Sequence, residues 1–268
     1  MAAVPPGGPA REFPWWLAVA AAIGLWLAAA IARDPVYAAI AATLWKGVGI
    51  TVMVTLVAFA AASAFGLLLA VALLSGSRVL RQAARFYVEI VRGVPIIVLL
   101  LYVAFVAAPA LVAGWNAVAG PLGLGPLQTR DLPLLWRAVA ALAIGYSAFL
   151  AEVFRAGIQS VDPGQVEAAK SLGLTGWLRF RLVVFPQAFR TVLPPLGNDF
   201  VALVKDSSLV SVLGVADVTQ LGKIYASGSF RFFETYNVVA FFYLVMTIGL
   251  SLTLRALERR LRAKDGRR

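Results

Sequence analysis

Long apolar stretches alternate with short polar segments along most of the chain. A helix of about 20 residues crosses the apolar core of a bilayer, and six stretches approach or exceed that length. The fifth of them is unusually polar. They cover residues 15–32, 48–74, 95–113, 136–154, 195–215 and 238–254. The pattern therefore predicts an all-α integral membrane protein with six transmembrane helices.

The composition agrees with this class. Of the 268 residues, 61% are hydrophobic and 14% are charged, whereas a soluble domain averages about 45–50% apolar and about 25% charged residues. Residues 1–10 lack the positive charge that opens a cleaved signal peptide, so the first stretch is expected to remain as a helix. Because they are rich in Pro and Gly, residues 1–10 are expected to be disordered. We find no internal repeat and no second soluble domain.

The basic residues indicate the orientation. If both termini and every second loop are cytoplasmic, 17 of the 24 Lys and Arg residues lie on that side and six on the other, with Lys205 inside a span. Cytoplasmic loops carry such an excess, so both termini are expected in the cytoplasm. Topology and contact with anionic lipid heads also explain the net charge of +11, and no nucleic-acid partner is expected.

The missing residue types exclude several chemistries. The chain has no Cys and no His, so it has no disulfide, thiol nucleophile, imidazole base or obvious transition-metal site. It also lacks the G-x-x-x-x-G-K-[ST] phosphate loop. We therefore expect no catalytic residues, no metal and no cofactor in this chain, and any energy must come from elsewhere.

The segment between the fourth and fifth stretches carries helix-start and helix-stop signals. Asp162 is placed as N-cap, Pro163 as first helical residue and Gln165 as the partner in a capping box. Gly173 is placed to end this helix in a left-handed conformation. The signals predict a short, well-defined cytoplasmic helix.

A second short helix is expected after Thr175, continuing until Pro186 disturbs it. A helix–glycine–helix hairpin is longer than a membrane loop needs, which favours a docking element. The alternative is an amphipathic hairpin that lies on lipid heads.

The hairpin resembles a known signature. It is similar to the cytoplasmic loop motif of ABC importer permeases. That motif reads E-A-A, three residues, G, nine residues, an aliphatic residue, one residue, an apolar residue and P. Phe185 stands where Leu is usual. The matching residues are Glu167, Ala168, Ala169, Gly173, Val183 and Pro186.

The flanking segments narrow the resemblance to the polar amino acid uptake permeases, the histidine, glutamine, glutamate and arginine group. They read VRGVPIIVLLLY, GYSAFLAEVFRAGIQSV and GNDFVALVKDSSLVSVLGV. The resemblance covers about residues 46–254. It leaves residues 1–45 as a tail with an extra helix and 255–268 as a basic cytoplasmic tail.

The resemblance implies a type I permease core in a bacterial inner membrane. It also implies that the loop at about 160–190 is a coupling helix held by separate ATPase subunits. Those subunits would carry ATP and Mg²⁺. A second permease subunit, identical or related, and an extracytoplasmic solute-binding protein are the other implied partners. The implied function is import of polar amino acids or related small zwitterions by alternating access, so the chain itself is not an enzyme.

Polar residues inside the spans are candidates for the substrate path. A charge at bilayer depth costs about 2.5–3.5 kcal/mol even on the gentlest scale, so such residues need a protein-lined or watery surrounding. The alternative is that Lys205 and Asp206 pair with residues of neighbouring helices, and that Glu152 pairs with Arg155 on one face of its own helix, three residues on. The candidates are Asn198, Asp199, Lys205, Asp206, Ser207, Ser208 and Glu152.

Two other classes of protein are less well supported by the sequence. A self-contained secondary transporter or channel would be favoured by inverted repeats or broken helices in matching halves, and neither is apparent. An intramembrane enzyme would need carboxylate or Ser/Lys pairs, and no spacing supports them.

Overall fold

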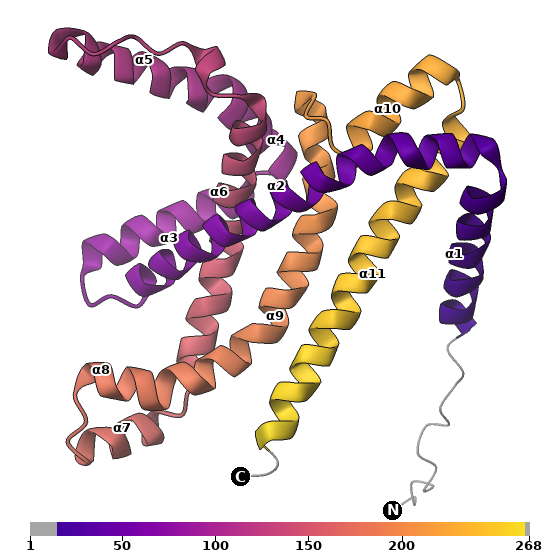
Figure 1. The fold of residues 1–268 in the computed structure, drawn as a ribbon. Helices are drawn as coiled ribbons and strands as arrows, with labels where there is room; N and C mark the ends of the chain where they lie inside the picture. The colour runs from indigo at the N-terminus through magenta and orange to yellow at the C-terminus, as the bar shows by residue number, and fades with distance from the viewer. Residues whose placement is uncertain (1–14, 266–268) are drawn as a thin grey trace, which may run out of the picture.

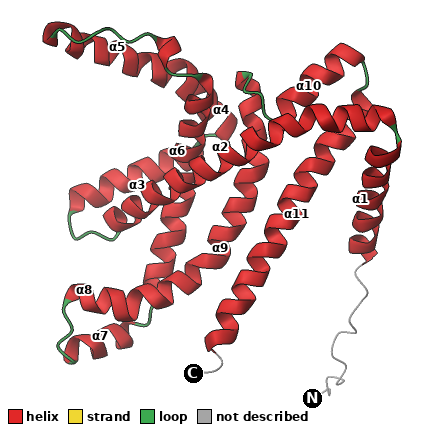
Figure 2. Cartoon of the chain, in the orientation of Figure 1, coloured by secondary structure: helices red, strands yellow, loops and turns green. Residues whose placement is uncertain are grey.

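The computed structural model describes residues 15–265, and those residues form helices and loops without any strand (Figure 2). Long helices α2 (Pro35–Leu73), α6 (Leu134–Gln159), α9 (Phe185–Asp206) and α11 (Phe232–Asp265) form the bundle, with α1 (Trp15–Arg33) beside α11 (Figure 1). The all-α fold is therefore confirmed.

Each of the six apolar stretches falls on helical chain. Within residues 15–265, four segments are long and apolar enough to cross a membrane: Pro35–Leu73, Ile96–Leu122, Leu134–Gln159 and Phe232–Leu257. The apolar part of α1, Ala18–Arg33, is shorter. The fifth stretch differs most, because α9 ends at Asp206 and a 3-10 helix, η5 (Ser207–Leu213), follows it. The prediction of one continuous helix over 195–215 was therefore wrong.

Helix α2 begins 13 residues before the expected start at residue 48. Pro35 occupies its first turn, and the Asp34 side chain accepts a hydrogen bond from the Val36 N–H at 2.8 Å. This Asp-Pro pair is a strong start signal. The proposed domain boundary between residues 45 and 46 thus falls inside one continuous helix.

The core lies where α2 crosses α6. Ala58, Ala62 and Leu150 are fully buried there. A Cβ atom on Gly66 would lie 2.9 Å from the Ser147 carbonyl oxygen. Small residues spaced four apart on α2 therefore let the two helices approach closely, as the sequence predicts for Ala62 and Gly66.

Two π-helical turns each end two residues before a proline. The first, η1 (Val103–Ala107), connects α4 (Ile96–Tyr102) to α5 (Ala108–Ala119) before Pro109, and the second, η4 (Phe180–Val184), precedes Pro186. Proline cannot donate to the carbonyl four residues back, and its ring collides with that carbonyl. A wider turn relieves both problems, so the chain stays helical through each proline.

The remaining elements lie around the bundle. Helix α3 (Arg78–Gly93) packs on α2 and α6, and α10 (Val218–Ser229) packs on α2 and α11. Two short 3-10 turns, η2 (Gly120–Leu122) and η3 (Thr129–Asp131), follow α5. The hairpin of α7 (Pro163–Ser171) and α8 (Gly176–Arg179) extends from the end of the bundle opposite α10 (Figure 1).

Candidate functional site

The hairpin begins at the expected N-cap. The Asp162 carboxylate accepts a hydrogen bond from the Gly164 N–H at 2.7 Å, with Pro163 as first helical residue. The expected capping box does not form. The Gln165 side-chain oxygen instead accepts a hydrogen bond from the Gln187 amide at 2.7 Å. A tertiary partner on α9 therefore takes the place of the local one and ties α7 to the bundle.

Helix α7 ends as expected at Gly173, whose φ of 76° is left-handed. The Gly173 N–H donates to the Lys170 carbonyl at 3.0 Å, and the Leu174 N–H donates to the Ala169 carbonyl at 3.1 Å. These two hydrogen bonds form a Schellman motif, which satisfies the last carbonyls of the helix. The corner of the hairpin is thus fixed by backbone geometry.

The second helix begins as expected but does not end at Pro186. The Thr175 hydroxyl accepts a hydrogen bond from the Leu178 N–H at 3.5 Å, which caps α8. The chain then continues through η4 into α9 without a break. The prediction that Pro186 disturbs this helix was wrong, because the π turn absorbs the proline. The second arm of the hairpin is therefore continuous with a bundle helix.

The signature residues divide between two surfaces. Glu167, Ala168 and Gly173 are exposed, whereas Ala169 is buried. Val183 and Pro186 are half-buried, and the Val183 carbonyl accepts a hydrogen bond from the Gln187 amide at 2.9 Å. Ala169, Val183 and Pro186 thus support the hairpin, while the other three face outward.

The outward surface offers both charge and apolar area. The Glu167 carboxylate binds none of the side chains that the structure describes. Leu172 is 81% exposed, Trp177 67% and Leu182 58%. Exposed large apolar side chains and an unpaired carboxylate on the same hairpin are typical of a surface that binds a protein partner. We call this surface, formed by α7, α8 and η4, the hairpin surface.

The polar residues of α9 and η5 are only partly brought together. Asp206 is half-buried and accepts a hydrogen bond from the Tyr146 hydroxyl of α6 at 2.8 Å. Ser207 is buried, and its hydroxyl donates to the Val204 carbonyl at 2.8 Å. This bond back into the last turn accompanies the change from α-helix to 3-10 helix after Asp206.

The other candidates differ in exposure. Asn198 and Lys205 are exposed, and Asp199 and Ser208 are half-buried. Within the part of the chain that the structure describes, none of these four side chains makes a hydrogen bond or ion pair. Asp206 thus has a fixed position, and the others remain available to a partner or a solute.

Glu152 pairs with Arg155 as the spacing suggests. The Arg155 Nε donates to the Glu152 carboxylate at 2.9 Å, and a second nitrogen of the same guanidinium donates to Gln159 at 2.6 Å. Both side chains are about a third exposed. The pair is internal to α6, so it satisfies Glu152 locally.

A buried network that the sequence analysis missed surrounds Asp217. Its fully buried carboxylate caps α10 by accepting a hydrogen bond from the Gln220 N–H at 2.8 Å. It also accepts a hydrogen bond from the Tyr243 hydroxyl of α11 at 3.0 Å. The Thr51 hydroxyl of α2 accepts a hydrogen bond from the neighbouring Val218 N–H at 3.4 Å. Burial raises the pKa of the Asp217 carboxyl, and the hydrogen bonds from Gln220 and Tyr243 oppose that rise. The network fastens α10 to α2 and α11.

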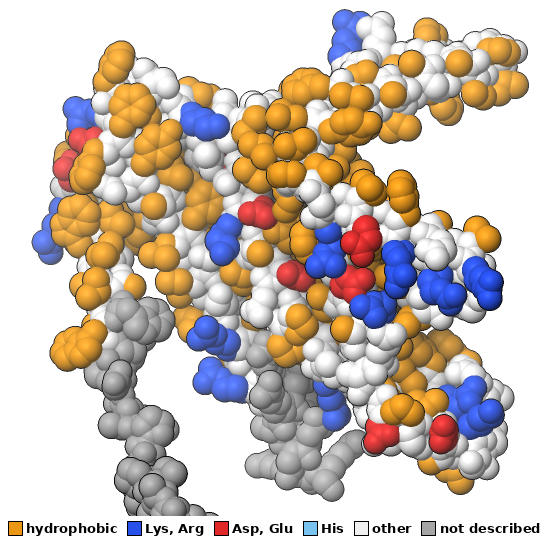
Figure 3. Space-filling model, turned by 180° about the vertical axis from the view of Figure 1, so that it is seen from behind, with side chains coloured by type: hydrophobic (Ala, Val, Ile, Leu, Met, Phe, Trp, Pro, Cys, Tyr) orange, Lys and Arg blue, Asp and Glu red, His pale blue; other side chains and the backbone are white. Residues whose placement is uncertain are grey.

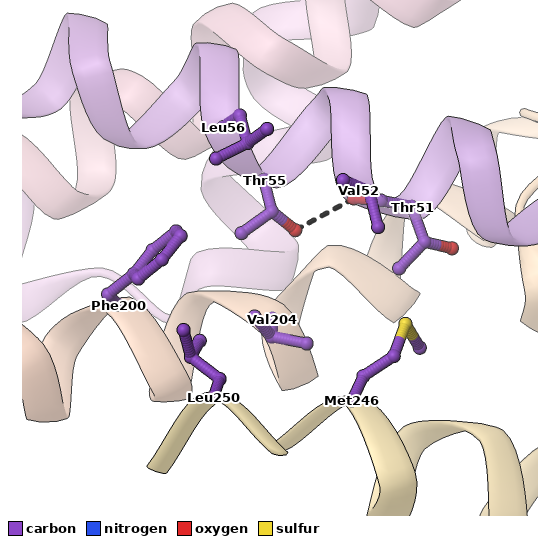
Figure 4. A pocket seen from close by; sticks show the side chains of 8 residues that line it. All are labelled: Thr51, Val52, Thr55, Leu56, Phe200, Val204, Met246 and Leu250. Atoms are coloured by element: carbon purple, nitrogen blue, oxygen red, sulfur yellow. Dashed lines mark hydrogen bonds between the residues drawn. The ribbon is translucent and has the colours of Figure 1, made fainter. Parts of the chain in front are cut away.

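A cavity of about 300 Å³ lies between α2, α9 and α11 (Figure 4). The only hydroxyls on its lining residues are those of Thr51 and Thr55, and the Thr55 hydroxyl is already bonded to the Thr51 carbonyl at 2.8 Å. The remaining lining residues are Val52, Leu56, Phe200, Val204, Met246 and Leu250. This cavity offers no charged group to a zwitterion, so it is not the expected polar path.

The fold and the sites together define a class. The chain is a multi-pass membrane protein with a rigid hairpin at one end, and residues 15–265 hold no group of three or more His, Cys, Asp or Glu side chains that could bind a metal ion. The long apolar helices are those of a multi-pass membrane protein.

Comparison with known proteins identifies the family. Residues 62–263 match the family of binding-protein-dependent transport system inner membrane components, and the chain belongs to this family. It is 36% identical to the probable amino-acid permease protein YxeN of Bacillus subtilis, over 81% of this chain and 90% of that protein. It is 35% identical to the glutamine transport system permease protein GlnP of Escherichia coli, over 82% and 93% respectively.

A solved structure agrees. The crystal structure of an amino acid ABC transporter with histidines matches with a TM-score of 0.68 and 38% identity, over 81% of this chain and 94% of that one. The type I importer fold and the permease assignment are thereby confirmed. As a member of this family the chain is a transporter subunit of the inner membrane, and ATP hydrolysis belongs to a separate subunit.

Proposed function

We propose that the chain is the permease subunit of an ATP-driven importer for polar amino acids or related small zwitterions. The similarity to amino-acid and glutamine permeases over four-fifths of the chain carries this proposal. The substrate would pass by alternating access, and the energy would come from ATP and Mg²⁺ on partner ATPase subunits.

The hairpin surface is the proposed coupling site. Glu167, Ala168 and Gly173 would contact the ATPase, and Ala169, Val183 and Pro186 would hold the hairpin in place. A capped helix corner fastened to α9 through Gln165 and Gln187 transmits a displacement better than a flexible loop. ATPase closure would thus move α9 directly through the continuous helical arm.

The remaining partners follow from the same proposal. A solute-binding protein would deliver substrate from the extracytoplasmic side, and a second permease subunit, identical or related, would complete the path. The charge distribution supports cytoplasmic termini, because the hairpin and most basic residues then share one side. The proposed organisation keeps residues 46–254 as the permease domain and 255–268 as a basic tail. The structure extends α11 to Asp265 within that tail.

The substrate path is proposed to include the α9–η5 residues, with Asp206 as its best-positioned member. We expect the complex with ATPase and binding protein to hydrolyse ATP faster when a polar amino acid is supplied. We also expect Asp206→Asn to reduce that stimulation several-fold while its melting temperature stays near wild type. A panel of amino acids, measured as stimulated ATPase activity of the purified complex, tests both expectations.

Tyr146→Phe is the matched control, because it removes the hydrogen bond to Asp206 and keeps the carboxylate. It is expected to retain most of the stimulation. If Asp206→Asn instead lowers the melting temperature and leaves activity per folded complex unchanged, Asp206 has a structural role. If no amino acid stimulates the wild-type complex, the proposed substrate class is wrong.

A further inference from the structure

Helix α3 presents three distinct faces. Ala84, Val88 and Val91 are buried against Leu69 of α2 and Ala151 of α6. The half-buried Tyr87 hydroxyl strengthens this contact by hydrogen bonding to the Ser147 hydroxyl of α6 at 2.9 Å. One face of α3 is therefore fixed to the bundle, and the other two face away from it.

The second face is basic. Arg78, Arg81, Arg85 and Arg92 are exposed and spaced three, four and seven residues apart, which places them on one side of a helix. Glu89 is the single acidic residue of α3 and lies on the same side. Basic side chains gather on the arm that α3 forms, at the right of Figure 3. This face has a net positive charge.

Much of this positive charge has no internal partner. Among the residues that the structure describes, Arg78 and Arg85 make no hydrogen bond or ion pair. Arg81 donates only to the Ser75 carbonyl at 3.2 Å, and the Arg92 guanidinium lies 5.6 Å from the centre of the Phe149 ring. None of the four is neutralised by a carboxylate, so the face can attract an anion.

The third face is apolar and exposed. Val79 is 78% exposed, Phe86 70% and Ile90 54%, and their spacing places them beside the basic face. A helix with adjoining basic and apolar faces suits the boundary between lipid heads and acyl chains. The chain path agrees, because α3 follows the apolar helix α2 and leads after two residues into the apolar segment Ile96–Leu122. Both ends of α3 are thus tethered to candidate spans.

We propose that α3 binds anionic phospholipid, with the arginine face on the headgroup phosphates and Val79, Phe86 and Ile90 among the acyl chains. Guanidinium groups are suited to phosphate because they donate in a planar fork. The apolar ridge needs acyl chains, which a free phosphate lacks. The proposal does not depend on the substrate or on the hairpin surface.

The test uses the purified chain in nanodiscs of phosphatidylcholine with increasing phosphatidylglycerol. Wild type is expected to melt at a higher temperature as phosphatidylglycerol increases. The triple variant Arg78→Gln/Arg81→Gln/Arg85→Gln should lose most of that increase. Each basic residue near an anionic surface raises the binding constant roughly fivefold. The apparent affinity of the triple Gln variant for phosphatidylglycerol should therefore fall by about a hundredfold at low salt.

Two further variants separate charge at this site from charge in general. The triple Lys variant of the same positions should retain most of the increase. The triple variant Lys46→Gln/Arg130→Gln/Arg231→Gln removes as much charge from exposed residues elsewhere and should behave as wild type. A cytoplasmic C-terminal reporter must remain cytoplasmic in each variant, because the same arginines contribute to topology.

Four outcomes would overturn the proposal. Wild type could melt equally in both lipids, or the Gln variant could keep the full increase. Glycerol phosphate without acyl chains could reproduce the effect, which would mean a free phosphate site. The Gln variant could bind lipid normally yet fail to co-purify with the ATPase, which would make α3 a subunit contact.

Discussion

Glu167→Lys is expected to reduce ATP-driven uptake to a tenth or less, roughly, while insertion and protein level stay near normal. Glu167 is exposed on α7, and its carboxylate has no partner among residues 15–265, so the change should leave the fold intact. The proposed coupling site pairs Glu167 with a basic surface of the ATPase, so reversing its charge would place like charges together, which costs several kcal/mol. Uptake by proteoliposomes that contain the complete complex is the measurement.

Glu89→Lys provides the matched control, because Glu89 is also an exposed, unpaired helical carboxylate but lies on α3. It should transport at near the wild-type rate. Co-purification adds a second measurement, since Glu167→Lys should also weaken ATPase binding. Wild-type uptake by the Glu167→Lys complex would remove Glu167 from the coupling site.

Gly47→Ala is expected to lower the melting temperature of the detergent-solubilised chain by several degrees, roughly 2–8 °C. A Cβ atom at Gly47 would lie 2.6 Å from the Asp217 carbonyl carbon and 2.6 Å from the Val218 nitrogen. This backbone cannot easily move, because Asp217 is held by Gln220 and Tyr243. Overpacking costs about 1–3 kcal/mol and should exceed the helix propensity of about 1 kcal/mol that Ala gains.

Gly49→Ala is the control on the same helix. A Cβ atom there would meet nothing within 4 Å. The variant should therefore melt at or slightly above the wild-type temperature, because Ala favours the helix. Equal melting of the two variants would show that α10 does not pack on Gly47 as the structure has it.

Features set by neighbouring residues were predictable from the sequence. Asp162, Gly173 and Thr175 each act through a hydrogen bond or a backbone angle within a few residues, and all three behave as expected. The Glu152–Arg155 pair follows from one turn of helix.

Features set by distant contacts were not predictable. The bond between Thr51 and Val218 joins residues 167 apart, and Gln165 finds its partner 22 residues away on α9. The network at Asp217 depends on three helices that come together only in the folded chain. Asp217 did carry one local signal, its position as N-cap three residues before Gln220.

The error at Pro186 has a local cause. Proline usually signals a helix end, yet Pro186 follows a π turn and the helix continues, as it also does at Pro109 inside the third apolar stretch. Inside α9, Pro194 and Pro195 are also tolerated. A sequence rule for proline assumes α-helical register, and the π turns before Pro109 and Pro186 remove the clash at those two positions.

The most direct test of the central claim compares uptake of labelled polar amino acids by two sets of proteoliposomes. One set contains the purified chain alone, and the other contains the chain with its ATPase and binding protein, each with and without ATP and Mg²⁺ on the ATPase side. The chain alone should neither hydrolyse ATP nor concentrate substrate, because it has no phosphate loop. The complex should concentrate substrate only when ATP is present. Robust concentrative uptake by the chain alone would contradict the account and indicate a secondary transporter.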